Sequence, residues 1–276
     1  MKFTLILAAA GLAFAAPGTK LTPRDTSPLV PRSARRARYS SAPNQRLSSL
    51  DSVSDANVQY SGNWAGAVQI GSGYNKVQGT ITVPEVSGAN GAAASAWVGI
   101  DGDTCQTAIL QTGVSFYADG SFDAWYEWIP DYAYSFSNFD VSVGDQIRMT
   151  VDASSKTKGV ATLENLSTNQ KVTHSFTNTP STLCETNAEW IVEAFQEGGS
   201  QVDLADFGTV TFTNAVASGT RGTTGPSGAQ VIDISLDQGQ TVEAAASISG
   251  NSVTVKARED MRMRRMLRYW DKMVEE

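Results

Sequence analysis

Gln111 is the first candidate for chemistry in this sequence. It lies in CQTAILQTG (105–113), which we interpret as a β-strand that stops near Gly113. Side chains alternate along a strand, so Gln111 shares a face with Cys105 and Ile109. Gln111 is therefore either a polar residue at a strand end or a neutral amide placed to donate and accept hydrogen bonds at a reacting group.

Carboxylates on aromatic and aliphatic strands are the second set of candidates. Alternation along SAWVGID, FDAWYEW and AEWIVEAF gathers their acidic residues on single faces. A carboxylate on such a face has a raised pKa if it is buried, which suits general acid–base catalysis, whereas Asp and Glu are ordinarily exposed. The faces consist of Trp97 with Asp101; Asp123, Trp125 and Glu127; and Glu189, Ile191, Glu193 and Phe195.

Three functions fit these residues. Paired carboxylates among aromatic residues on a β-fold suit a glycoside hydrolase, the same surface without chemistry suits a carbohydrate-binding lectin, and one carboxylate beside a neutral amide suits a peptidase. HExxH, CxxC and GxSxG are absent, which argues against zinc proteases, redox enzymes and α/β-hydrolases. The Asp-Thr-Gly signature of aspartic proteases is also absent, and the single histidine, His174, is interpreted as a surface strand residue.

Short strands must position these side chains. Segments rich in β-branched and aromatic residues, separated by Gly, Asn, Asp, Ser and Pro, predict an all-β fold, a β-sandwich or jelly roll. Residues 256–276 differ, because apolar residues recur there at helical spacing and predict an appended amphipathic helix. The expected strands are 76–83, 95–100, 122–129, 146–153, 159–165, 171–177, 188–195, 208–213, 230–236 and 252–255.

The N-terminal region of the 276-residue chain has the composition of a processed leader. Residues 1–15 carry one Lys, an apolar run and small residues, which predicts a secretory signal peptide and export. Residues 16–58 are rich in Pro, Ser and Arg and are expected to be a largely disordered, basic pro-segment, with a disordered linker as the alternative. The region 57–255 holds six Lys or Arg against twenty Asp or Glu, so opposite charge would hold the leader on it.

This acidic balance also bears on partners and working pH. With few ion pairs to lose, such a protein tolerates protonation of its carboxylates, which is compatible with work in acid. The basic run RRAR within an exported acidic protein does not favour nucleic-acid binding, and no apolar stretch is long enough to span a membrane. The two cysteines, Cys105 and Cys184, are most simply one disulfide in an exported protein, and Asn165 begins an N-glycosylation sequon.

Several longer motifs make the comparison with known proteins specific. SAWVGIDGDTCQTAILQTG (95–113), DAWYEWIPD (123–131), ATLENLSTNQKV (161–172) and LCETNAEWIVEAF (183–195) resemble the glutamic peptidases, the eqolisin family, in order and spacing. The resemblance covers about residues 59–255, which we take as the peptidase domain. It implies a secreted acid endopeptidase, made as a preproprotein, with a sandwich of two large antiparallel sheets. The tail 256–276 has no counterpart in the family.

The resemblance also implies which residues act. The family's catalytic Gln falls on Gln111 and its catalytic Glu on Glu193 rather than Glu189. The family's disulfide corresponds to Cys105–Cys184. Residues similar to those that line the family's cleft are Trp97, Asp101, Asp123, Trp125 and Glu127.

These roles predict a mechanism. Glu193 takes a proton from water and returns it to the leaving amine, while the Gln111 amide donates to the oxyanion and its oxygen orients the water. No metal and no organic cofactor is implied. The expected partners are polypeptide substrates and the protein's own pro-segment as an intramolecular inhibitor; nucleic acid and membranes are not expected, and a monomer is the default.

Overall fold

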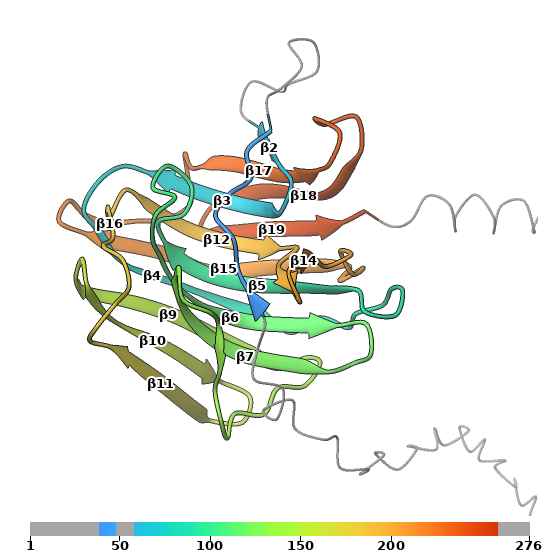
Figure 1. Cartoon of the computed structure of the whole chain (residues 1–276), viewed down its shortest axis with the longest axis horizontal. Helices are drawn as coiled ribbons and strands as arrows, with labels where there is room; N and C mark the ends of the chain where they lie inside the picture. Colours follow the sequence, from blue (N-terminus) through green and yellow to red (C-terminus); the bar gives the residue numbers. More distant parts are fainter. Residues whose placement is uncertain (1–38, 48–57, 259–276) are drawn as a thin grey trace, which may run out of the picture. The chain divides into compact units, whose positions relative to one another are not determined.

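The computed structural model describes residues 39–47 and 58–258, and these residues form two β-layers that pack face to face (Figure 1). The layers are joined edge to edge, so that sixteen strands form one hydrogen-bonded order, β11-β10-β9-β4-β15-β19-β18-β17-β3-β12-β5-β6-β7-β8, with β16 beside β15 and β2 beside β17. The predicted all-β sandwich of antiparallel strands is therefore confirmed. Among the described strands, β2 and β17 pair in parallel, and the other strand pairs are antiparallel.

One layer carries the strands in which the candidate site residues lie. Its strands are β2 (Val58–Ser61), β3 (Trp64–Ile70), β5 (Ala93–Ile100), β6 (Ile109–Tyr117), β7 (Phe122–Ile129), β8 (Tyr134–Ser135), β12 (Asn187–Glu193), β17 (Gln230–Ser235), β18 (Val242–Ser249) and β19 (Ser252–Ala257). The opposite layer holds β4 (Tyr74–Thr82), β9 (Gln146–Ser155), β10 (Lys158–Asn165), β11 (Gln170–Phe176), β15 (Thr209–Gly219) and β16 (Gly222–Thr224). A separate small sheet consists of β1 (Tyr39–Ser40), β13 (Gln196–Glu197) and β14 (Ser200–Gln201).

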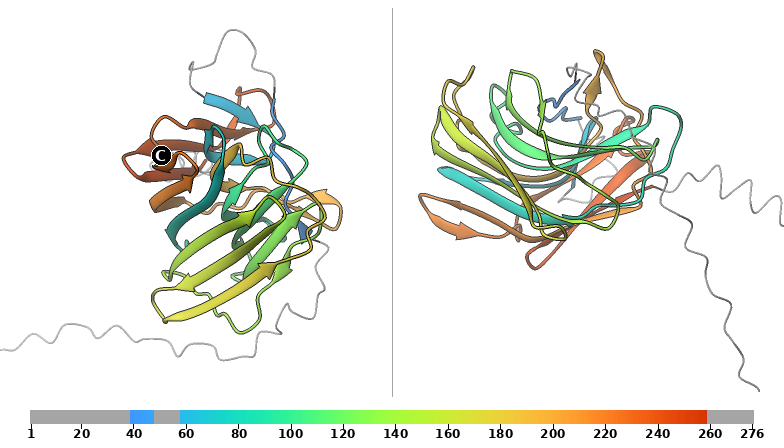
Figure 2. Two further views of the ribbon diagram at one scale, coloured as in Figure 1. Left: turned by 90° about the vertical axis from the view of Figure 1, so that its left-hand side faces the viewer. Right: turned by 90° about the horizontal axis from the view of Figure 1, so that it is seen from below.

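Strand β15 links the two layers. Its first residues, Thr209–Phe212, pair with β19, whereas the residues from Thr213 onward pair with β4. The pairing shifts register between Thr213 and Val216, and Asn214 there has a left-handed φ of 51°. A bulge of this kind bends a strand and increases its twist, so β15 can begin in one layer and end in the other (Figure 2).

Two clusters of buried side chains explain why β5, β6 and β12 are buried on both faces. The larger cluster fills the space between the layers and includes Trp190, whose indole Nε1 donates to the carbonyl oxygen of Gln78 at 2.8 Å. The second cluster covers the other face of the site-bearing layer and includes Trp64, Trp97 and Trp125. Alternation therefore sends even-numbered residues of β12 into the first cluster and odd-numbered residues toward the second.

Strand β6 differs from the predicted one. It begins at Ile109 and runs through Gly113 to Tyr117, so Gln111 is its third residue and does not end a strand. Gly113 is needed for close approach: a Cβ there would lie 2.3 Å from the carbonyl oxygen of Ala96 and 2.6 Å from the Cβ of Trp97. Glycine thus marks tight packing within the strand, and the interpretation of Gly113 as a stop was wrong.

The ends of the chain lie mostly outside the described residues. The last strand continues two residues beyond the expected boundary at 255, to Ala257, and the predicted helix beyond it lies outside the described part. Of the pro-segment, which is expected to be largely disordered, residues 39–47 have a defined structure, because they bind along the site described below. Within the described ranges, no helix is long and apolar enough to cross a membrane.

Candidate active site

Four neighbouring strands, β12, β5, β6 and β7, position the candidate catalytic side chains. Gln111 on β6 lies opposite Glu127 on β7 and Gly99 on β5, and Gly99 in turn lies opposite Glu189 on β12. Glu193 lies four residues further along β12 than Glu189, on the same face. All four polar side chains are fully buried in the described structure, so the prior expectation of exposed carboxylates fails for the three glutamates.

Glu193 is surrounded by hydrogen-bond donors. Its Oε2 accepts from the Trp97 indole Nε1 at 2.9 Å and from the Ser41 hydroxyl, and its Oε1 accepts from the Ala42 backbone N–H at 3.0 Å and the Asn63 amide at 3.5 Å. Burial raises the pKa of Glu193 to about 7, and the donors from Ser41, Ala42 and Trp97 oppose that rise. Glu193 can therefore exchange a proton in the range used by general acid–base catalysts.

Gln111 and Glu127 form a pair. The Gln111 Nε2 donates to Glu127 Oε2 at 2.7 Å, and the same oxygen accepts from the Ser41 backbone N–H at 3.2 Å. Burial, followed by the nearby charge of Glu193, raises the pKa of Glu127 well above its ordinary range. Ser41 thus contacts both carboxyl groups: its hydroxyl donates to Glu193, and its backbone N–H donates to Glu127.

Segment 39–47 crosses this site as an extended chain. Ser40 pairs with Gln196 in the short β1–β13 ladder, and the carbonyl oxygen of Ala42 accepts from the Trp64 indole Nε1 at 3.0 Å. The Asn44 N–H donates to the Gly102 carbonyl oxygen at 3.0 Å. Polar contacts therefore follow the segment from one end to the other.

Arg46 fixes the far end of the segment through Asp103. The Arg46 Nε donates to Asp103 Oδ1 at 2.9 Å, its Nη2 contacts Oδ2, and the Asn44 amide donates to Oδ1 at 2.6 Å. Asp103 has a fully buried side chain, whereas that of Arg46 is 40% exposed. Neither Asp103 nor Asn63, whose Oδ1 accepts from the Gln45 N–H at 2.9 Å, was singled out from the sequence. The only signal for Asp103 was its presence in the motif 95–113, and Asn63 lies in none of the motifs given above.

The five residues predicted to line the cleft have different surroundings. Trp97 contacts Glu193, and Glu127 contacts Gln111. Trp125 and Asp123 lie on the same face of β7 as Glu127, where the Trp125 indole donates to the Ser95 hydroxyl at 3.1 Å and Asp123 accepts from the Ser135 hydroxyl at 2.9 Å. The structure thus gathers four of the five on one face of the sheet.

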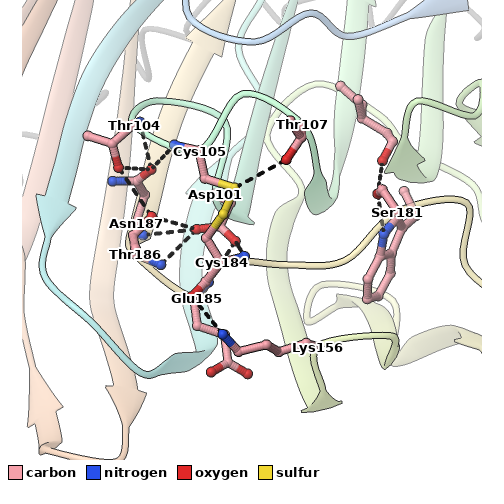
Figure 3. The surroundings of a disulfide bond; sticks show 12 residues. Asp101, Thr104, Cys105, Thr107, Lys156, Ser181, Cys184, Glu185, Thr186 and Asn187 are labelled. Carbon is pink, nitrogen blue, oxygen red and sulfur yellow. Dashed lines mark hydrogen bonds between the residues drawn. A yellow bond between two sulfur atoms is a disulfide. The ribbon is translucent and has the colours of Figure 1, made fainter.

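Asp101 has a structural place instead (Figure 3). Its carboxylate accepts from the backbone N–H groups of residues 184–187, at 2.7 to 3.2 Å, and from the Thr186 hydroxyl. These bonds fix the chain that leads into β12, so the carboxylate is not presented to a ligand. The disulfide Cys105–Cys184 forms beside it, as expected, and joins the chain before β6 to the chain before β12.

This region does not form a metal site. Among the described residues, one group of potential metal ligands lies close together: Asp101, Cys105 and Cys184. The two sulfur atoms of this group are bonded to each other in a disulfide. Metal-binding thiolates are therefore not available there. The prediction that no cofactor takes part stays a prediction.

Asn165 differs from expectation, whereas His174 lies on a strand as predicted. The Asn165 side chain is fully buried, and its Nδ2 donates to the Asp140 carbonyl oxygen at 3.1 Å and to Asp145 Oδ2 at 2.9 Å. The folded protein does not present this amide for glycosylation. His174 lies within the edge strand β11, as expected, and is half-buried because it stacks on Tyr126 with ring centroids 3.9 Å apart, on the face of β7 opposite to Glu127.

Glu189 has a testable effect on stability. No hydrogen-bond partner of either carboxyl oxygen is found among the described residues, and burial raises its pKa well above the ordinary value of 4.5, with Asp101 and Asp103 adding to the rise. The folded form therefore holds a proton that the unfolded form releases above about pH 4.5, so the free energy of unfolding decreases with rising pH by about 1.4 kcal/mol per unit until Glu189 ionises in the folded state.

We predict that Glu189→Gln makes this decrease shallower. Denaturant unfolding at a series of pH values from 4 to 7 measures the slope. Glu164→Gln is the control of opposite sign, because Arg148 lowers the pKa of Glu164, whose stabilising contribution is present at neutral pH and is lost on acidification. An unchanged slope for Glu189→Gln would show that Glu189 does not carry this proton.

The β-sandwich, with a buried glutamine and buried glutamates on one sheet face, agrees with the glutamic peptidases that the sequence resembles. The chain belongs to the peptidase A4 family, whose pattern matches residues 62–257. It is 50% identical to Aspergillopepsin-2 of Aspergillus niger in an alignment 284 positions long, gaps included, which covers 92% of this chain and 99% of that protein. Identity to Scytalidopepsin B of Scytalidium lignicola is 41% over 267 residues, with coverage of 92% and 98%.

Solved structures agree with this assignment. The fold matches that of scytalido-glutamic peptidase bound to a transition state analog inhibitor with a TM-score of 0.69 and 44% identity, covering 71% of this chain and 98% of the other. Aspergilloglutamic peptidase from Aspergillus niger matches with a TM-score of 0.58 and 60% identity, covering 60% and 99%. The resemblance to the eqolisins is thus confirmed, and the chain is a glutamic-type endopeptidase rather than a glycosidase or a lectin.

Proposed function

We propose that this protein is a secreted acid endopeptidase in which Gln111 and Glu193 activate water against a peptide bond. It is made as a preproprotein, with a signal peptide over 1–15, a pro-segment over 16–58 that is removed near residues 52–60, and a catalytic domain from 59 onward. Its substrates are polypeptides, and the mature enzyme acts as a monomer without metal or organic cofactor.

The observation that carries this proposal is the path of segment 39–47. A stretch of extended polypeptide lies across the site, with Ser41 between Glu193 on one side and the Gln111–Glu127 pair on the other. Donors from Trp64 and Asn63 reach its backbone carbonyl oxygens. A site that holds one polypeptide in this way is suited to hold a polypeptide substrate.

The same contacts support the role of the pro-segment as an inhibitor. The Ser41 hydroxyl and the Ala42 N–H occupy both oxygens of Glu193, which is where an attacking water would have to be deprotonated. Arg46 and Asn44 hold the segment through the buried Asp103. The inhibitor therefore blocks the proposed base directly.

The mechanism in the mature enzyme follows from the groups. Glu193 takes one proton from a water molecule as the oxygen attacks the carbonyl carbon, and the Gln111 amide donates to the oxyanion that forms. The tetrahedral intermediate then collapses, the C–N bond breaks, and Glu193 gives its proton to the leaving nitrogen. Glu193 returns to its starting state, and the overall reaction consumes one water.

Removal of the pro-segment changes the surroundings of Glu193 in two ways. Burial is the main cause of the raised pKa of Glu193, and part of that burial is due to residues 41 and 42. Their departure admits water, which favours the ionised form of Glu193, and it also removes the Ser41 and Ala42 donors, which favour that form in the precursor. The two changes act on the pKa of Glu193 in opposite directions, while the Trp97 and Asn63 donors remain in the mature enzyme.

Gln111→Ala tests the proposal most directly. We predict that the matured variant loses about 10²- to 10³-fold in kcat, the effect of removing one oxyanion donor, with little change in KM. The measurement is pepstatin-insensitive protein digestion between pH 2 and 6, beside Gln146→Ala, which alters an exposed glutamine at the start of β9. Full activity of Gln111→Ala, or sugar release that depends on Glu127, would contradict the proposal.

A further inference from the structure

The Gln111–Glu127 pair has two unsatisfied oxygens. Gln111 Nε2 donates to Glu127 Oε2 at 2.7 Å, but no hydrogen-bond partner of Gln111 Oε1 or of Glu127 Oε1 is found among the described residues. Both side chains are fully buried. A buried oxygen without a donor is unfavourable, so the pair has a reason to adopt a second arrangement.

Protonation of Glu127 supplies that arrangement. An ionised carboxylate only accepts hydrogen bonds, so it faces the amide nitrogen, whereas a neutral carboxylic acid also donates one O–H. Rotation of the Gln111 amide by half a turn places its Oε1 toward Glu127. This oxygen then accepts the hydrogen bond from the Glu127 O–H. The amide nitrogen, with both N–H groups, then turns away from Glu127.

The charges around Glu127 favour its neutral form. The titratable groups that face it are Glu193 from β12 and Asp131, which follows β7, and both are acidic. The donors that face it are the Ser41 N–H from the pro-segment and the Gln111 amide from β6. The Ser41 N–H stabilises the ionised form of Glu127. Removal of the pro-segment takes this donor away and so favours the neutral form. Of the two carboxyl groups, Glu193 keeps its Trp97 and Asn63 donors and is the one suited to ionise first.

We propose that Glu127 is a positioning residue whose proton sets the orientation of the Gln111 amide. In the neutral form, Glu127 donates its O–H to Gln111 Oε1 and directs Nε2 toward the oxyanion. In the ionised form, Glu127 accepts from Nε2 and withdraws that donor from the reaction. No bond of the substrate forms or breaks at Glu127, and Glu193 alone transfers protons. This inference rests on the proposed roles of Gln111 and Glu193.

A pH dependence follows from this arrangement. Activity requires Glu193 to be ionised and Glu127 to be neutral, so the acidic limb of the kcat/KM profile belongs to Glu193 and the limb on the neutral side to Glu127. The two groups interact, so each limb reports on the pair. As pH rises through the ionisation of Glu127, Gln111 turns and activity falls although the base is still present.

Glu127→Gln separates these roles, because a glutamine at 127 donates an N–H to Gln111 Oε1 at every pH. We expect the matured variant to keep acid activity within about fivefold of wild type and to show its neutral-side decrease at least about one pH unit higher. Glu127→Met offers neither donor nor acceptor. It should lower kcat about 100-fold with little change in KM, and it should add little to the loss caused by Gln111→Ala in the double variant.

Full-length chains are matured in acid. Variants that do not mature themselves are processed by a tagged wild-type enzyme, which is then removed. Intact mass confirms the processing, and thermal unfolding confirms the fold. Asp233→Asn controls for the loss of a buried carboxyl in the same layer but outside the site, and it should leave the profile unchanged below pH 6. The inference is overturned if the folded Glu127→Gln profile superposes on that of wild type, or if Glu127→Gln loses more than about 100-fold at every pH, which would make Glu127 a proton donor. Retained activity of Gln111→Ala would instead refute the proposed function.

Discussion

Glu193→Gln is expected to lower kcat of the matured enzyme by about 10³- to 10⁴-fold while leaving the fold intact, because it removes the general base but keeps the shape of the side chain. The amide can still accept from the Trp97 indole through its oxygen, so the packing of β12 against β5 persists. Protein digestion at the pH optimum of wild type measures the loss, and near-ultraviolet circular dichroism measures the packing of the buried tryptophans.

The matched control for Glu193→Gln is Glu189→Gln. Both residues are buried glutamates on the same face of β12, and Glu189, not Glu193, lies in the row that contains Gln111. If contact along that row decided catalysis, Glu189→Gln would be the inactive variant. Loss of activity in Glu189→Gln, together with activity within tenfold of wild type in Glu193→Gln, would exchange the assigned roles.

Arg46→Glu is expected to accelerate maturation of the full-length chain by about 10- to 100-fold at the same pH, the equivalent of losing a charge-assisted hydrogen bond of about 1.5–3 kcal/mol. The substitution places a second carboxylate against the buried Asp103 and removes the donors that hold it. Intact-mass measurement over time follows the conversion.

The control for Arg46→Glu is Arg24→Glu, which makes the same change of charge elsewhere in the leader. Equal acceleration by both variants would mean that the leader is held by its overall charge, as the sequence alone suggested. No acceleration by either would mean that the Asp103 contact does not limit release. Only a larger effect at position 46 agrees with the structure.

The sequence predicted those strands best whose residues alternate or are β-branched. The expected strand over 122–129 coincides with β7, and the one over 146–153 lies within β9. Strand β18 (Val242–Ser249) was missed because AAAS is poor in β-branched and aromatic residues. The strand of Gln111 was misplaced because a glycine in a strand was interpreted as a terminator, although tertiary packing against Trp97 requires it.

The site was predictable in residue identity and not in arrangement. Motifs selected Gln111 and Glu193, but nothing in the local pattern tells a buried strand face from an exposed one, so the burial of Glu127 and Glu189 could not be foreseen. The position of Ser41 depends on contacts with residues more than eighty positions away. Such contacts follow from the packing of whole layers, which a single sequence does not reveal.

The connection between segment 39–47 and β2 has a consequence for how activity would be released. Only ten residues, 48–57, separate them, so in the intact chain the segment faces its site at an effective concentration on the order of millimolar, whatever the dilution of the protein. One cut within 48–57 turns the segment into a separate peptide, and its occupancy then depends on its concentration in the surrounding fluid. Dilution of the cleaved protein would complete the activation that the cut begins, without any change in a single contact.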